Sequence, residues 1–455
     1  ILHTTSKGGV SVKSYEQIPR SRGDSAVMLD CGSGETGVYC FSTTLSHGSY
    51  VPVMEGTKIK GSLWEFVDQF CQGGPAAAHE FSQHIVNNVQ CLRDGPPPEA
   101  RDGDSISVNI ILGLTGVNRD LIIASHRPEN DEESFNEQLT QFLEEVTVHI
   151  ETVLCTSAIV CFKVFVPRGD QEAYFELVAT RYLCKLLWTE LEKLGMEENT
   201  AMEIDSIFSD AVKKRHSASN HEMTITDLRR ACRSVREQET LRRKFKEFAD
   251  DRGMCSRDAF TKAMIEDDEL RSVLVMPRFF KGVCSAGGGS MQLSILQRLS
   301  ADVELFSVPV GNKVPIHNRR FSPVVTSEEI VRWQEHVETK ILECRLPNET
   351  TGKGMARGLF ICISAFFYAA KTAKLPERIL SHSHVVKELK KALDVVDRTD
   401  QKTVANLCNA LTYFTTVCDP EQSYFLFKRN WRFEGREYTA TWTLGWWLDS
   451  AEALQ

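Results

Sequence analysis

Short apolar runs alternate with longer amphipathic stretches over the first third of the chain, a pattern typical of alternating strands and helices. The runs predict strands at 26–29, 38–41, 106–112 and 159–166. The amphipathic stretches predict helices at 63–71, 76–92, 133–154 and 171–194. Alternation of this kind predicts an α/β domain with a central sheet.

Strand signals return after residue 270 and are followed by helices, which predicts a second α/β lobe. We expect strands at 272–276, 282–285, 291–296 and 303–310, helices at 327–344, 359–373, 384–396 and 402–417, and aromatic strands with a turn over 424–447. The order suggests that the end of the chain returns to the first lobe.

Within the predicted second lobe, residues 196–270 are rich in charge and poor in strand signal, and we interpret them as an α-helical insertion. Within it, Phe245 to Phe260 resembles an EF-hand, but Ala249, Arg252 and Met254 interrupt the ligand series and no bidentate Glu closes it. A calcium-free helical pair is therefore expected rather than a calcium sensor. The domain prediction is a tail at 1–23, lobe I at 24–168 completed by about 438–455, and lobe II at 169–437 containing the insertion.

Composition excludes some classes of partner. With a net charge of −9 and 25% charged residues, the chain lacks the basic excess of a general nucleic-acid binder. The longest apolar window, 358–370, is too short to cross a bilayer, so we expect a soluble protein without a membrane span. The 14 cysteines lie singly, several within apolar runs, which predicts mostly reduced thiols and favours a cytoplasmic over a lumenal or secreted location.

Two glycine-rich stretches, each after an apolar run, are candidate phosphate loops. Exposed backbone N–H groups beside hydroxyl donors suit an oxyanion, and the carboxylate of Asp30 suits a cation or its bound water. The candidate phosphate ligands are Ser33, Gly34 and Thr36 in the first loop and Gly287, Gly288 and Gly289 in the second. Two loops of similar design suggest a duplicated architecture whose halves close over a polyphosphate chain.

Two further stretches contain candidate chemistry. Glu172 lies in the first turn of a helix after a strand and a glycine, where it could act as a general base for water, or merely favour the helix N-terminus through the dipole. Thr115 and Arg119 follow a buried strand and could contact phosphate oxygens, although an ordinary strand end with a solvated Arg119 is an equal alternative.

In order and wording these four stretches resemble the motifs of the nucleoside triphosphate diphosphohydrolase (apyrase) family of the actin-like ATPase superfamily. The matching segments are Asp30 to Thr36, Leu114 to Arg119, Gly169 to Ala173 and Ser285 to Gln292. The resemblance implies a two-lobed actin-like (ribonuclease H-like) α/β fold, each lobe a mixed sheet flanked by helices. It also places the family's catalytic glutamate on Glu172.

The resemblance continues to the C-terminus, through Ile363 to Tyr368 and Thr441 to Leu448. In the family an aromatic from each segment sandwiches the nucleobase, which implies Tyr368 and Trp442 here. Stacking is physically sensible because every base offers a π-face. From the residues alone, such an aromatic segment would more often be core.

Departures from the family pattern bear on activity. Where the family has an aspartate that holds the metal through water, this chain has Ser285, and a glycine of the second motif is Val117. A neutral hydroxyl balances a cation less well than a carboxylate does, so binding of Mg²⁺ or Ca²⁺ should weaken. The family's water-positioning serine and metal-side glutamine are retained as Ser290 and Gln292.

The sequence therefore predicts hydrolysis of nucleoside tri- or diphosphates at the terminal phosphate, an activity that the missing carboxylate at position 285 is expected to impair. The alternative is a catalytically weakened apyrase-like protein that serves as a binding or scaffold subunit and contacts a protein partner through its inserted helices. An exopolyphosphatase-like enzyme would share the two loops, but it would not need Tyr368 and Trp442.

Overall fold

In a computed structural model the chain divides into two compact units, residues 1–175 with 443–455, and residues 176–442. The structure describes residues 2–3, 11–12, 26–32, 35–46, 49–88, 107–115, 118, 135–154, 159–186, 204, 207–209, 211–212, 222–231, 238–267, 270, 274, 280–296, 303–344, 356–433 and 436–452. Within these residues no helix is both long enough and apolar enough to cross a bilayer.

The first unit is built on a seven-stranded mixed sheet with the order β2-β1-β7-β6-β3-β4-β5. Its strands are β1 (Leu2–His3), β2 (Ser11–Val12), β3 (Ala26–Cys31), β4 (Glu35–Ser46), β5 (Ser49–Lys60), β6 (Ser107–Leu114) and β7 (Ile159–Phe165). β3, β6 and β7 run parallel, whereas β4 and β5 are antiparallel to their neighbours. The predicted tail thus contributes two short strands beside β7.

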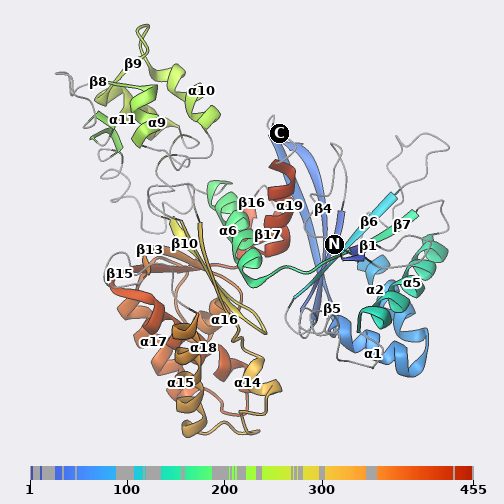
Figure 1. The fold of residues 1–455 in the computed structure, drawn as a ribbon. Helices are drawn as coiled ribbons and strands as arrows, with labels where there is room; N and C mark the ends of the chain where they lie inside the picture. The colour runs from blue at the N-terminus through green and yellow to red at the C-terminus, as the bar shows by residue number, and fades with distance from the viewer. Residues whose placement is uncertain are drawn as a thin grey trace. The chain divides into compact units, whose positions relative to one another are not determined.

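Helices cover both faces of this sheet. α1 (Leu63–Gly73), α2 (Ala76–Asn88) and α5 (Phe135–Leu154) group together (Figure 1) and bury apolar residues against β3, β4 and β6. The C-terminal helix α19 (Trp442–Glu452) packs on the sheet through Trp447, whose ring stacks 5.5 Å from that of Phe41. α6 (Gly169–Leu186) begins in this unit and continues into the second.

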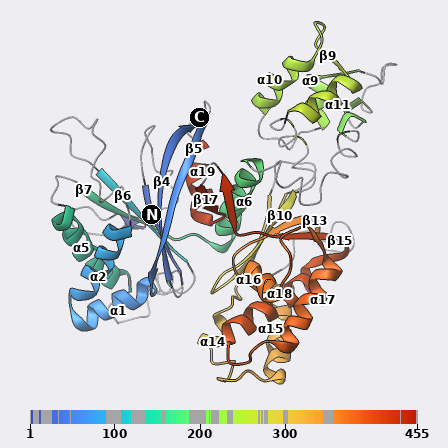
Figure 2. The same ribbon diagram turned by 180° about the vertical axis from the view of Figure 1, so that it is seen from behind.

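The second unit is built on a six-stranded sheet with the order β12-β11-β10-β13-β15-β14. Its strands are β10 (Phe280–Ala286), β11 (Met291–Leu296), β12 (Val303–Val308), β13 (Ala356–Cys362), β14 (Leu380–Ser381) and β15 (Cys418–Phe427). Its helices are α14 (Val314–His317), α15 (Ser327–Glu343), α16 (Ala365–Thr372), α17 (His382–Val395) and α18 (Gln401–Val417), seen together in Figure 2. α18 is buried along most of its length, because it lies in the apolar core between the sheet and α15. A separate hairpin, β16 (Asn430–Phe433) with β17 (Arg436–Thr439), precedes α19.

The same strand arrangement occurs in both sheets. In the first, β5-β4-β3 are antiparallel and β3-β6-β7 parallel; in the second, β12-β11-β10 are antiparallel and β10-β13-β15 parallel. Counted among these five strands alone, both sheets have the chain order third, second, first, fourth, fifth. This repeat confirms the predicted fold class, a two-lobed α/β protein with a mixed sheet and flanking helices in each lobe.

The predicted insertion contains short strands and helices (Figure 1). They are β8 (Glu222–Thr224), α9 (Ile225–Ala231), α10 (Gln238–Phe248), β9 (Met254–Ser256) and α11 (Arg257–Glu266). β8 pairs antiparallel with β9. Each of the two strands leads directly into a helix, β8 into α9 and β9 into α11.

Three secondary-structure predictions were wrong. The segment expected as one helix at 359–373 is β13 followed by α16, since Leu359 to Cys362 are buried on both faces of the sheet and show no strand periodicity. The closing aromatic segment ends in a helix, α19, rather than a strand. In the strand expected at 272–276, Leu274 is helical, and the neighbouring residues lie outside the described part of the chain.

Candidate functional site

The first glycine-rich loop is the turn between β3 and β4. Gly32 begins this turn, and its N–H donates to the carbonyls of Asp30 at 3.1 Å and Glu35 at 3.2 Å. Thr36 is fully buried in β4 opposite Cys31. Ser33 and Gly34, predicted to bind phosphate, lie outside the described residues. The described ends of this loop thus join two antiparallel strands, and its predicted phosphate binding stays a prediction.

Asp30 and Thr115 come together at this turn from neighbouring parallel strands. Thr115 Oγ1 donates to Asp30 Oδ1 at 3.3 Å, and the Thr115 N–H donates to the Cys31 carbonyl at 3.1 Å. The two residues are 85 positions apart in the chain, so the sheet creates the pairing. Arg119, the other predicted phosphate ligand of this segment, lies outside the described residues.

Asn118 supports the same turn, a role not predicted from the sequence. It is fully buried, and its Nδ2 donates to the carbonyls of Cys31 at 2.8 Å and Gly32 at 3.1 Å. Its Oδ1 accepts from the Trp64 N–H at the start of α1, at 3.0 Å. One side chain therefore joins the first loop to a helix. A polar residue after a strand was visible in the sequence, but its partners were not.

Replacing Asn118 with alanine should destabilise the protein by roughly 2 to 4 kcal/mol, because two carbonyls and one N–H lose their buried partner. Urea unfolding of native protein and variant measures this cost. Asn118→Asp is the matched variant, since it retains the acceptor for Trp64 but places a buried carboxylate oxygen against the carbonyls of Cys31 and Gly32, so it should be at least as destabilised as Asn118→Ala. Native stability in Asn118→Ala would contradict the assignment.

The second loop occupies the same position in the second sheet, between β10 and β11. The Gly287 N–H donates to the Ser290 carbonyl at 2.8 Å. The carbonyls of Gly287 and Gly288 accept from the N–H groups of Asn312 at 3.1 Å and Lys313 at 3.0 Å. Within the described part of the chain, the N–H groups of Gly288 and Gly289 have no hydrogen-bond partner. These two donors can therefore bind an oxyanion.

At the base of the second loop, four buried polar side chains form a connected cluster. Ser285 and Gln292 lie opposite each other on β10 and β11, and Ser285 Oγ lies 3.1 Å from Gln292 Oε1. Gln292 Nε2 contacts Ser290 Oγ at 2.6 Å. Ser285 Oγ also donates to the carboxylate of Glu176, from α6. The predicted trio of Ser285, Ser290 and Gln292 is thus brought together, and Glu176 is an unpredicted fourth member.

Ser285 and Asp30 occupy equivalent places. Each is the penultimate residue of the strand that leads into a glycine turn, β3 in the first unit and β10 in the second. Asp30 places a carboxylate at this position in the first unit, and Ser285 places a hydroxyl there in the second. The carboxylate of Glu176 contacts that hydroxyl, so the second unit also has an acidic group beside its loop.

Glu172 lies in the first turn of α6, as predicted, and is buried. The other acid of this turn, Asp170, forms an ion pair with Arg168 at 3.0 Å. The hydrogen bond from Arg168 lowers the pKa of Asp170, which makes that carboxylate a weaker base. Glu172 is therefore the better candidate for proton abstraction in this turn.

The two aromatic residues expected to sandwich a nucleobase have different environments. Tyr368, on α16, is 40% exposed, and the guanidinium carbon of Arg429 lies 5.1 Å from the centroid of its ring. Trp442, at the start of α19, is buried. Arg429 is a cation on an aromatic face that sequence reasoning did not select.

Oxygen donors dominate the candidate metal ligands. Among the described residues no group of three or more His, Cys, Asp or Glu side chains is arranged to hold an ion. Asp30 in the first unit presents carboxylate oxygens, and Glu176, Ser285 and Gln292 in the second present carboxylate, hydroxyl and amide oxygens, the ligand types that Mg²⁺ and Ca²⁺ prefer. The donor chemistry therefore fits the predicted cations.

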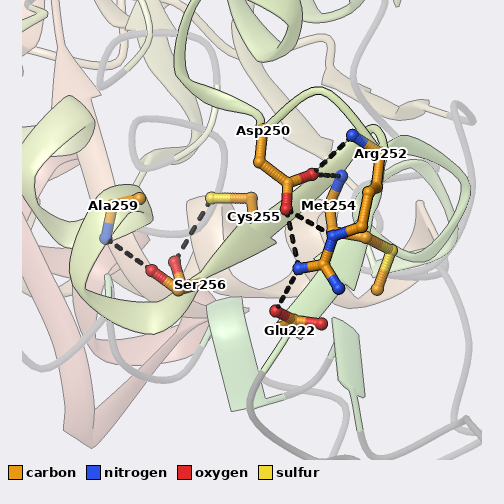
Figure 3. A network of polar contacts seen from close by, with 7 residues as sticks. All are labelled: Glu222, Asp250, Arg252, Met254, Cys255, Ser256 and Ala259. Atoms are coloured by element: carbon orange, nitrogen blue, oxygen red, sulfur yellow. Dashed lines mark hydrogen bonds and ion pairs between the residues drawn. The ribbon is translucent and has the colours of Figure 1, made fainter.

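The EF-hand-like segment of the insertion is stabilised by an arginine (Figure 3). The Asp250 carboxylate accepts from the N–H groups of Arg252 at 3.0 Å and Met254 at 2.9 Å, and from the Arg252 guanidinium at 2.7 Å. The same guanidinium donates to Glu222 of β8 at 2.9 Å. The cation that binds the carboxylates of Asp250 and Glu222 is thus the guanidinium of Arg252.

The position of Gly253 shows which residues of this loop stand where an EF-hand has its calcium ligands. Gly253 has a φ of +71°, as the sixth position of an EF-hand loop requires, and Ser256 caps α11 by accepting from the Ala259 N–H at 3.2 Å. With Gly253 at position six, the first, fifth and twelfth positions are Phe248, Arg252 and Ala259. Two of these three side chains have no oxygen or nitrogen donor, and the third is a cation.

We expect this loop not to bind calcium. Isothermal titration with Ca²⁺ should give the same isotherm for native protein and Asp250→Asn, because any binding would come from elsewhere in the chain. A dissociation constant tighter than about 1 mM that is lost in Asp250→Asn would contradict the expectation.

Comparisons with known proteins give similarity of fold only. No family model matches the sequence, and no curated protein matches it. Among solved structures, the chain is similar to a Ppx/GppA phosphatase from Aquifex aeolicus, with 12% identity, a TM-score of 0.40, and 89% of this chain and 95% of that chain covered. It is also similar to an exopolyphosphatase from Cytophaga hutchinsonii, with 10% identity, a TM-score of 0.42, and coverage of 89% and 94%. A structure of nucleoside triphosphate hydrolases from Neospora caninum gives 12% identity, a TM-score of 0.43, and coverage of 93% and 91%. None of these similarities assigns a role to a residue of this chain.

Proposed function

We propose that the protein hydrolyses the terminal phosphoanhydride bond of nucleoside tri- or diphosphates. The observation that carries this proposal is the repeated glycine turn, found at the same position of two sheets with oxygen-bearing side chains at its base. Two anion-binding turns suit a chain of several phosphates better than a single phosphate group. The motif resemblance to apyrases supports the same reaction.

In this proposal Glu172 removes a proton from water as the water oxygen forms a bond to the terminal phosphorus. The bond from that phosphorus to the bridging oxygen breaks, and the shorter nucleotide leaves with the electron pair. Ser290 positions the water. Thr115, Arg119 and the N–H groups of the two loops bind phosphate oxygens, which stabilises the charge of the transition state.

A bound Mg²⁺ or Ca²⁺ would neutralise negative charge on the phosphates. We propose Asp30, Gln292 and Ser285, the last through water, as its ligands. Tyr368 and Trp442 are the proposed nucleobase contacts, and they separate this substrate class from inorganic polyphosphate, which has no base to stack.

Phosphate release from ATP, ADP and inorganic polyphosphate, each with Mg²⁺ or Ca²⁺, tests the proposal. We expect release from the nucleotides and less from polyphosphate. Equal release from polyphosphate would favour the exopolyphosphatase alternative. No release from any substrate would reject the hydrolase.

The second candidate function is a binding or scaffold subunit. It is favoured by the insertion, where the Arg252 guanidinium takes the place of a cation between the carboxylates of Asp250 and Glu222, so that this helical pair suits contact with a protein better than binding of an ion. Nucleotide binding without phosphate release would support this candidate.

A further inference from the structure

We infer that Glu176 restores, from a different element, the carboxylate that position 285 lacks, so that Glu176, Ser285 and Gln292 bind a divalent cation beside the second loop. This inference deepens the proposed function and rests on it for the role of the cation. The three side chains come from α6, β10 and β11 and belong to the second unit.

Glu176 is 109 residues away from Ser285 in the chain, yet its carboxylate accepts the Ser285 hydroxyl. All three side chains are buried, with Glu176 only 8% exposed. A buried carboxylate therefore lies at the base of the second glycine turn, in contact with the residue that occupies the place of Asp30.

The Ser285 hydroxyl has more potential acceptors than protons. A serine hydroxyl carries one proton, but Ser285 Oγ lies within hydrogen-bond distance of both the Glu176 carboxylate and Gln292 Oε1. When the Ser285 proton goes to Glu176 and the Gln292 amide donates to Ser290, Ser285 Oγ and Gln292 Oε1 face each other with no proton between them. A cation would satisfy the excess of lone pairs. With the amide turned over the cluster would be complete without a cation, which is the alternative that the experiment must distinguish.

Glu176 supplies the negative charge that a divalent cation at this place would need. Hard divalent cations prefer carboxylate, hydroxyl and amide oxygens, and at least one carboxylate is needed to balance their charge. Ser285 and Gln292 are neutral, whereas Glu176 is the acidic side chain that joins them. The carboxylate of Glu176 therefore provides, in contact with Ser285, the negative charge that position 285 lacks.

Mn²⁺ binding to the full chain, followed by the electron paramagnetic resonance signal of free Mn²⁺, tests this inference without nucleotide or hydrolysis. Mn²⁺ accepts the same oxygen ligands. We expect the native protein to bind Mn²⁺ and Glu176→Gln to bind it roughly 10- to 100-fold more weakly. Glu388→Gln is the matched control, because it removes a half-buried carboxylate of α17 in the same unit, paired with Lys391.

The decisive variant combines Glu176→Gln with Ser285→Asp. It moves the carboxylate to the other side of the same hydrogen bond, so it should recover most of the lost affinity, which a merely structural role of Glu176 would not allow. Ser285→Ala removes one of the three oxygens and should also weaken binding, so the test does not depend on Glu176→Gln folding. Native protein that binds no Mn²⁺, or equal binding by native protein and these single variants, would overturn the inference. Mn²⁺ binding with the expected pattern but no phosphate release would reject the proposed function alone.

Discussion

Glu172→Gln is expected to lower the rate of phosphate release by about 10²- to 10⁴-fold while leaving nucleotide affinity nearly unchanged. The amide keeps the size of the side chain but cannot accept a proton. Because the substitution acts on the chemical step, the loss should fall on kcat rather than on KM. Steady-state release of phosphate from ATP and ADP measures both.

The matched control lies two residues earlier on the same helix turn. Asp170→Asn also removes one negative charge from the N-terminus of α6, but Asp170 is paired with Arg168, and its pKa is lowered by that contact. We expect its kcat to remain within about threefold of native, since losing an exposed ion pair costs little. If both variants lost activity equally, the helix terminus and not Glu172 would be responsible.

Gly311→Ala is expected to distort the second loop. A methyl group at Gly311 would lie 2.3 Å from the carbonyl carbon and oxygen of Gly288 and 2.5 Å from the N–H nitrogen of Gly289, distances that backbone atoms cannot accept. Because the loop must move, we expect a stability loss of about 1 to 3 kcal/mol and a fall in phosphate release on the order of 10²-fold. Thermal unfolding and steady-state kinetics measure the two effects.

Gly73→Ala is the control for Gly311→Ala. Gly73 ends α1, and a methyl group there would meet nothing within 4 Å. It should therefore leave stability and activity close to native. Native activity in Gly311→Ala would show that the second loop need not keep its position for hydrolysis.

Much of the architecture was predictable because buried strands leave a strong apolar signal. β3, β6, β7, β10 and β11 were all expected close to their observed positions. β5 was not, since it contains Pro52 and Gly56, which predict a loop, yet it lies at the edge of its sheet, where proline is tolerated. β13 was taken for a helix because a fully buried parallel strand has no alternation of polar and apolar residues.

The candidate site was predictable only where local sequence determines geometry. The two glycine turns and the first-turn position of Glu172 follow from neighbouring residues. The pairing of Thr115 with Asp30 and the contact of Glu176 with Ser285 depend on sheet and helix packing over 85 and 109 residues. Glu176 lies one helical turn after Glu172, a spacing that places both on one face of α6, but nothing in the sequence indicated Ser285 as its partner.

If the proposed function is correct, both glycine loops bind one and the same phosphate chain. Isothermal titration of native protein with a non-hydrolysable ATP analogue and Mg²⁺, repeated with Gly32→Val and Gly288→Val, addresses this directly. We expect one analogue bound per chain and a loss of affinity of at least tenfold in each variant. Two independent sites per chain, or a variant in either loop that binds the analogue as tightly as native protein does, would contradict it.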